Sequence, residues 1–181
     1  MRKEIRFSGS GGQGVILASV ILGTAAALYE NKHAVQSQSY GPEARGGASK
    51  ADVIISDEPV KYPKARNIDF MLCLTQKAAD KYLPDLKEGG VVLIDSDYVD
   101  VPENGKYKVV KLPISSTTYD KQGKLIALNI VSLSAFVEVT KLVSEDSLEK
   151  AVLQAAPKGT EDFNMEAVKI GRELAKTLKQ L

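Results

Sequence analysis

The sequence predicts an α/β fold: a single three-layer domain, residues 1–181, whose mostly parallel sheet lies between helices. Two observations lead to this prediction. Several segments are near-continuous apolar runs, such as Val91–Asp95 (VVLID), which are typical of strands buried on both faces. These runs alternate with helical patterns, and the C-terminal third is almost wholly helical. A length of 181 residues matches one domain of ordinary size.

The strands are predicted where short apolar or alternating runs end at glycine, proline or acidic residues. The first, Glu4–Ser8, alternates polar and apolar side chains and leads directly into a glycine cluster. Val35–Tyr40 is a more polar segment for which an extended conformation is one reading. The remaining predicted strands, in chain order, are Ala51–Ser56, Ile68–Leu74, Val91–Asp95 and Lys108–Leu112.

The first helix, Val15–Tyr29, carries apolar residues on every face, so we expect it to be covered on both sides. Its apolar run is shorter than the roughly 20 residues that span a bilayer, which argues against a membrane segment. The later helices are Gln76–Tyr82, one turn at Ser115–Lys121, Leu128–Val143, and Asp146–Ala155 with Ser144 as N-cap. A last helix places Phe163, Ala167, Ile170, Leu174, Leu178 and Leu181 on one face.

A glycine-rich turn, Gly9–Gly14 (GSGGQG), joins the first strand to the first helix in a Rossmann-like G-x-G-x-x-G pattern. Glycines let the backbone approach a ligand closely, and N–H groups at a helix start favour an anion. The alternative is a tight turn that needs glycine only for packing. A dinucleotide site also needs an acidic residue at the end of the second strand, and Val35–Tyr40 has none.

A second glycine-rich segment, Tyr40–Gly47 (YGPEARGG), follows Val35–Tyr40. Its Arg45 is suited to phosphate or carboxylate, and Gly46 and Gly47 expose backbone N–H groups. The alternative is a solvated turn with a weak local ion pair between Glu43 and Arg45. If Val35–Tyr40 is a strand of the parallel sheet, this loop lies beside the turn Gly9–Gly14.

The composition excludes several classes of function. Lys and Arg total 24 against 23 Asp and Glu, which argues against a nucleic-acid partner. Cys73 and His33 are the only residues of their types, so the chain cannot hold an iron–sulfur cluster by itself. Cys73 is expected to be an inert buried thiol and His33 a surface turn residue. No nucleophile has an evident base partner.

Two acidic residues, Asp95 and Asp97, come at the end of a predicted strand. They could bind a cation, but a capping or turn role is the preferred reading. Ser115–Thr118 is expected to cap a helix.

The segments GSGGQGVILASVILGTAA and QSYGPEARGG together resemble the gamma subunit of 2-oxoacid:ferredoxin oxidoreductases, and the resemblance covers essentially the whole chain. The form SYGPEARGG is most similar to the 2-oxoglutarate branch. The resemblance implies an enzyme that oxidatively decarboxylates a 2-oxoacid with coenzyme A, yielding an acyl-CoA, CO₂ and reduced ferredoxin. Residues 1–181 would then be one gamma-type domain.

The resemblance also implies partners and cofactors. Thiamine diphosphate, magnesium and iron–sulfur clusters would lie on other chains, namely alpha and beta and, in some forms, delta subunits. Ferredoxin would be the electron acceptor. Apart from the resemblance, the single cysteine fits a cytoplasmic location, the short apolar run predicts no membrane and the balanced charge no nucleic acid as partners. No cofactor is expected to be bound by this chain alone, and contact with coenzyme A is a hypothesis.

The hypothetical coenzyme A or anion contacts are Gly9, Gly11, Gly12, Gln13, Gly14, Tyr40, Gly41, Glu43, Arg45, Gly46 and Gly47. No catalytic residue and no metal ligand are predicted. The favoured reading is an accessory subunit, inactive alone, that shapes the coenzyme A side of a 2-oxoglutarate enzyme. The alternatives are a subunit for pyruvate or another 2-oxoacid, a purely structural assembly subunit and, least favoured, a stand-alone dinucleotide-binding oxidoreductase.

Overall fold

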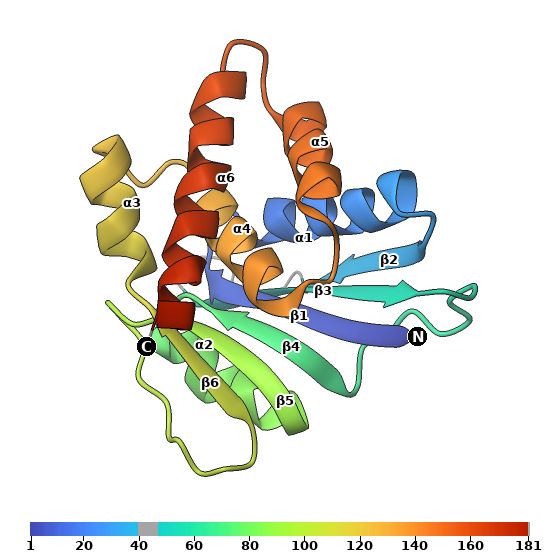
Figure 1. Ribbon diagram of the computed structural model, residues 1–181. Helices are drawn as coiled ribbons and strands as arrows, with labels where there is room; N and C mark the ends of the chain where they lie inside the picture. The colour runs from blue at the N-terminus through green and yellow to red at the C-terminus, as the bar shows by residue number, and fades with distance from the viewer. Residues whose placement is uncertain (40–46, 181) are drawn as a thin grey trace.

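The computed structural model describes residues 1–39 and 47–180 (Figure 1). A six-stranded sheet forms its centre, with strand order β2-β3-β1-β4-β5-β6. The pairs β1–β4, β4–β5 and β5–β6 are all parallel. This confirms the predicted α/β class with a mostly parallel sheet. The strands are β1 (Arg2–Ser10), β2 (His33–Gln38), β3 (Ala48–Ser56), β4 (Ile68–Cys73), β5 (Leu86–Asp95) and β6 (Lys108–Leu112).

One strand runs against the others: β3 is antiparallel to both of its neighbours, β1 and β2. The reason is the length of the connection from β2 to β3, since residues 39–47 are too few for a parallel crossover. Because both β1 and β2 oppose β3, they point the same way, and their carboxyl ends share one edge of the sheet. The segment Val35–Tyr40 is therefore largely a strand, as one reading allowed, although the strand ends at Gln38.

Helices cover the two faces of the sheet unequally (Figure 1). Most of the helices and a thick apolar core lie on one face, while the other face is covered by the short helix α2 with η3 and loops. The helices are α1 (Val15–Thr24) with its π-helical continuation η1 (Ala25–Tyr29), α2 (Gln76–Tyr82), η3 (Leu83–Asp85), α3 (Ile114–Gln122), α4 (Leu128–Thr140), α5 (Glu145–Ala155), α6 (Glu161–Lys176) and η4 (Thr177–Gln180). Among the described residues, none of these is long and apolar enough to cross a membrane.

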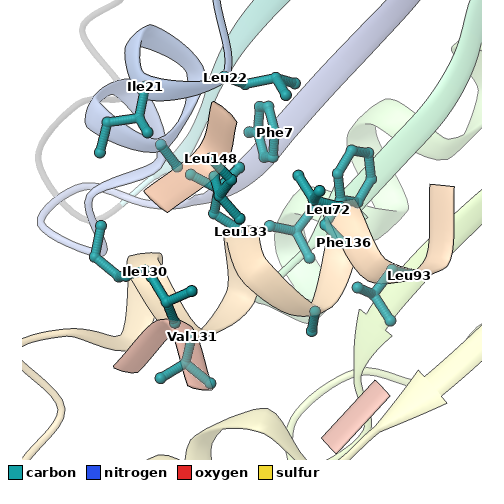
Figure 2. Packing of buried hydrophobic residues seen from close by; sticks show 14 of the residues in the cluster. Phe7, Ile21, Leu22, Leu72, Leu93, Ile130, Val131, Leu133, Phe136 and Leu148 are labelled. Carbon is teal, nitrogen blue, oxygen red and sulfur yellow. The ribbon is translucent and has the colours of Figure 1, made fainter. Parts of the chain in front are cut away.

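The central strand β1 contributes to both cores because its side chains alternate across the sheet. Phe7 enters the thick core, where its ring packs on Phe136 of α4 with centroids 5.0 Å apart. Figure 2 shows these two residues together with Leu72 of β4 and Leu93 of β5, which belong to the same core. On the opposite face Ser8 donates a hydrogen bond to the carbonyl oxygen of Leu72.

Most predicted helices are present, and Ser144 is the N-cap of α5, as predicted, accepting a hydrogen bond from the backbone N–H of Ser147. The helix predicted to reach Val143 ends earlier, because Lys141 adopts a left-handed backbone conformation after Thr140. Along α6 the predicted apolar face packs on the core, although Leu181 lies outside the described residues. There Gly171 lets α6 approach α4 so closely that a Cβ would overlap the carbonyl oxygen of Val131.

A buried ion pair, which the sequence reading missed, lies on the thin face of the sheet. Arg6 of β1 has a side chain only 2% exposed, and it donates to both carboxylate oxygens of Asp52 on β3, at 2.7 and 2.9 Å. Its remaining contacts are a hydrogen bond to Asp85 and a cation–π contact with the ring of Tyr82, 5.5 Å away. Paired geometry of this kind offsets the cost of burying the charge.

We predict that Asp52→Ala lowers the free energy of unfolding by about 3 kcal/mol, because it leaves Arg6 buried without its bidentate partner. The matched control is Asp146→Ala, which breaks the exposed pair with Lys150 and should cost about 0.5 kcal/mol or less. Urea denaturation of both variants checks this. Equal losses in the two variants would contradict the assignment.

Candidate functional site

The predicted glycine turn links β1 to α1 at the carboxyl edge of the sheet. Gly11 and Gly12 are exposed at its tip, and Gly12 and Gly14 adopt left-handed backbone angles, with φ of 88° and 75°. The side-chain oxygen of Gln13 accepts a hydrogen bond of 2.7 Å from the backbone N–H of Ser10. Gln13 therefore holds the turn closed.

Gly9 and Gly14 are restricted by close neighbours in this turn. A Cβ at Gly9 would lie 2.5 Å from the side-chain oxygen of Gln13. A Cβ at Gly14 would lie 2.6 Å from the side-chain nitrogen of Asn129, whose amide is 3.4 Å from the carbonyl oxygen of Gly14. By contrast, a Cβ at Gly12 would meet nothing within 4 Å. Packing thus restricts Gly14 strongly and Gly9 less, because the Gln13 side chain can move, whereas Gly12 favours glycine only for its backbone angle.

The start of α1 has the features of an anion site. Gly14 is the N-cap residue and has no side chain to accept from the helix, and the first turn of α1 contains no acidic residue. The first N–H groups of an α-helix have no acceptor within the helix. They and the helix dipole favour a negatively charged ligand in front of α1.

The second predicted loop re-enters the sheet beside this turn. It begins after β2 and ends at β3, where Ala48 is paired with Ser10 of β1. Gly47, which directly precedes Ala48, is buried. The predicted proximity of the two loops is therefore confirmed for this end of the second loop. The other predicted contacts, Tyr40, Gly41, Glu43, Arg45 and Gly46, lie outside the described residues.

Asn129 near the start of α4 was missed in the sequence reading. Its side chain touches Gly14, and the residue is only 8% exposed. The available signal was a single amide at the start of the otherwise apolar segment LNIVSLSAF. Such a residue inside a buried helix usually has a hydrogen-bond partner.

Asp95 and Asp97 cap the start of helix α3, which confirms the capping role preferred to cation binding in the sequence analysis. Asp95 is fully buried and accepts hydrogen bonds from the Ser115 hydroxyl at 2.5 Å and the Ile114 N–H at 3.1 Å. Burial raises the pKa of Asp95, against the lowering effect of the Ser115 hydroxyl. Asp97 accepts from the N–H of Ser116 at 2.7 Å.

The expectation that Ser115–Thr118 cap this helix was wrong. These residues lie inside α3, whose N-cap position is Pro113 without a side-chain cap. The carboxylates that cap the helix come instead from the end of β5. Helix α3 extends over nine residues, where one turn was predicted, and ends before Gly123, which adopts a left-handed conformation.

Cys73 is completely buried, as predicted, and burial raises its pKa to about 12. A cluster ligand must be a thiolate, so this side chain does not fit an iron–sulfur cluster. In the parts of the chain that the structure describes, no group of three or more His, Cys, Asp or Glu could hold a metal ion. His33 is exposed, as expected, but it begins β2 and so is not a turn residue.

We predict that Gly14→Ala destabilises the protein more than Gly12→Ala. Both substitutions force an L side chain into a left-handed conformation, at about 1–3 kcal/mol, but only Gly14→Ala also meets Asn129. Adding Asn129→Ala should recover part of the loss in Gly14→Ala and none in Gly12→Ala. Thermal unfolding of the single and double variants measures this, and rescue of both glycine variants alike would contradict it.

Comparison with known proteins identifies relatives over the full length of the chain. The chain is 54% identical to the 2-oxoglutarate synthase subunit KorC of Methanocaldococcus jannaschii, over 98% of this chain and 96% of the relative. The structure is similar to the gamma subunit of a keto/oxoacid ferredoxin oxidoreductase from Geobacter sulfurreducens, with 50% identity, a TM-score of 0.89 and coverage of 98% of both chains.

The fold also occurs within a longer chain. The 2-oxoglutarate:ferredoxin oxidoreductase of Magnetococcus marinus, solved with 2-oxoglutarate, coenzyme A and succinyl-CoA bound, matches with a TM-score of 0.84 and 22% identity. The match covers 97% of this chain but 31% of that one. At this identity the likeness shows the fold.

The family model described as pyruvate ferredoxin/flavodoxin oxidoreductase matches residues 4–174. Together with the full-length relatives, this match shows that the chain belongs to the pyruvate ferredoxin/flavodoxin oxidoreductase family, as the gamma-type subunit of a 2-oxoacid oxidoreductase complex.

Proposed function

We propose that this chain is the accessory gamma subunit of a 2-oxoglutarate:ferredoxin oxidoreductase, inactive alone, which helps to form the coenzyme A side of the active site. The complex would convert 2-oxoglutarate, coenzyme A and oxidised ferredoxin into succinyl-CoA, CO₂ and reduced ferredoxin. The observation that carries the proposal is the 54% identity to a 2-oxoglutarate synthase subunit over nearly the whole of both chains. It favours 2-oxoglutarate over pyruvate or another 2-oxoacid.

The reacting cofactors are proposed to lie on the partner alpha and beta subunits, with ferredoxin as the electron acceptor and the cytoplasm as the location. Thiamine diphosphate would supply the carbon chemistry and iron–sulfur clusters the electron transfer. The buried thiol of Cys73 supports this division, because it is the single cysteine of the chain and cannot ligate a cluster where it lies. Residues 1–181 are proposed to act as one domain.

The proposed role toward coenzyme A rests on the two loops at the carboxyl edge. Coenzyme A carries several phosphate charges, which suit the start of α1 and an arginine fork. Gly9, Gly11, Gly12, Gln13 and Gly14 form the first loop, and Gly47 ends the second. The fold's occurrence in an oxidoreductase solved with coenzyme A bound supports the same ligand.

A dinucleotide role finds little support in the geometry. The second strand in chain order ends at Gln38, followed by Ser39, so the described end of this strand has no carboxylate to bind a ribose hydroxyl.

Assembly is tested by co-expressing this chain with the cognate alpha and beta chains. We expect one complex in which 2-oxoglutarate, coenzyme A and ferredoxin support turnover, whereas the isolated chain is inactive. A chain that stays free of its partners, or a complex that prefers pyruvate, would contradict the proposal.

The phosphate role is tested with Arg45→Ala in the assembled complex. Loss of a charge-assisted hydrogen bond, worth about 1.5–3 kcal/mol, should raise the KM for coenzyme A at least about tenfold and leave the KM for 2-oxoglutarate unchanged. Arg66→Ala is the charge-matched control, because Arg66 bonds Tyr62 in the loop before β4. If the KM for coenzyme A does not change while assembly weakens, the loop serves assembly instead.

A further inference from the structure

The helix that begins at the glycine turn has an uncharged outer face. From Val15 to Tyr29 the sequence contains no charged residue. One side of this helix, including Val15 and Leu22, is buried against the sheet and the neighbouring helices. On the outer side, Leu17, Val20 and Leu28 are 45%, 42% and 63% exposed. These three residues form the outer α1 face.

A helix that rests on a sheet with one side normally has polar residues on the other. The sequence predicts that both sides of the helix Val15–Tyr29 are buried. The described part of this chain buries one side only. Scattered single apolar residues on a surface are ordinary. Here three of them recur at helical spacing on a stretch without a single charge, which is typical of a surface that another chain covers.

A hollow next to this face gives it a place for a partner's side chain. The cavity measures about 230 Å³ and lies between α1, α4, α5 and α6. Leu17 lies at the cavity together with Ile126, which is 75% exposed, and the apolar lining includes Ile130, Val152 and Phe163. An apolar pocket beside an exposed apolar helix face is the usual setting for an anchoring residue of a protein interface.

The kind of partner that covers this face is inferred from a longer oxidoreductase chain that contains the same fold. The same fold makes up 31% of a longer 2-oxoglutarate:ferredoxin oxidoreductase chain, so there it is joined to the rest of that chain in one polypeptide. In a complex of separate subunits, the corresponding contacts must form between chains. Interfaces of permanent complexes are more apolar than the rest of a protein surface, like a domain core divided in two.

We propose that the outer α1 face and the adjoining hollow are the surface on which another subunit of the same oxidoreductase complex docks, with an apolar side chain of that subunit in the hollow. The proposal rests on the proposed function, because it takes the partner from that complex. A second copy of this chain is the competing occupant.

Cysteine labelling of the assembled complex tests the contact without disturbing the fold. Cys73 is buried, so a cysteine introduced at an exposed position is the reactive thiol of this chain. In Val20→Cys, maleimide labelling should slow at least about tenfold on assembly with the partner subunits. Tyr62→Cys is the control, since Tyr62 is 46% exposed in the loop before β4, and its labelling should not change. Equal labelling of Val20→Cys in the free and assembled chain would overturn the proposal.

Charge substitutions test the energetic role of the same face. Leu17→Asp and Leu28→Lys should each weaken assembly at least about tenfold, whereas Tyr62→Lys should not, with the melting temperature of each free chain showing that it folds. Assembly of both variants as tightly as the wild type would overturn the docking surface and leave the proposed function standing. A wild-type chain that never joins its partners would overturn both.

Sedimentation of the isolated chain distinguishes the two occupants. We expect a wild-type monomer. A wild-type dimer that Leu17→Asp dissociates, with unchanged binding to the partner subunits, would assign the face to a second copy and overturn the proposal.

Discussion

The position of β1 between β3 and β4 is the constraint on which the rest of the structure depends. Its pairing with β4 fixes the parallel half of the sheet, and its pairing with β3 places Ser10 opposite Ala48. The glycine turn and the end of the second loop therefore meet at one edge only because this register holds. The same strand sends Phe7 into the thick core and Arg6 into the thin one, so a slip by one residue would exchange an apolar and a charged layer.

Local signals made much of the fold predictable. The helix Gln76–Tyr82 and the strand Lys108–Leu112 have the predicted bounds, and Ser144 caps its helix, because each depends on neighbours within a few residues. The antiparallel direction of β3, the pair between Arg6 and Asp52, and the contact of Asn129 with Gly14 were not predicted. Each depends on which distant segments become neighbours, and no local pattern carries that information.

The glycines of the turn are required for different reasons. Gly14 must be glycine because Asn129 occupies the space beside it and because its φ is positive. That requirement arises within this chain and needs no ligand. Gly12 is exposed, and a Cβ there would meet nothing within 4 Å, so only its positive φ favours glycine at this position. Motif matching treats these glycines alike, whereas the structure separates the one restricted by a neighbouring side chain from the one restricted only by its backbone angle.

Helix α1 carries both the proposed anion site, at its N-terminus, and the proposed docking surface, on its outer side. A helix is stiff over ten residues, and its rise of about 1.5 Å per residue puts Leu17 within one turn of Gly14. A partner that docks on the outer α1 face would therefore also fix the position of the helix start and of the glycine turn in front of it. Charged side chains on this face would oppose its burial by a partner, and the face has none. The N-terminus attracts an anion through its backbone N–H groups and so needs no charged side chain on the face. The same helix can then serve assembly along its side and ligand binding at its end.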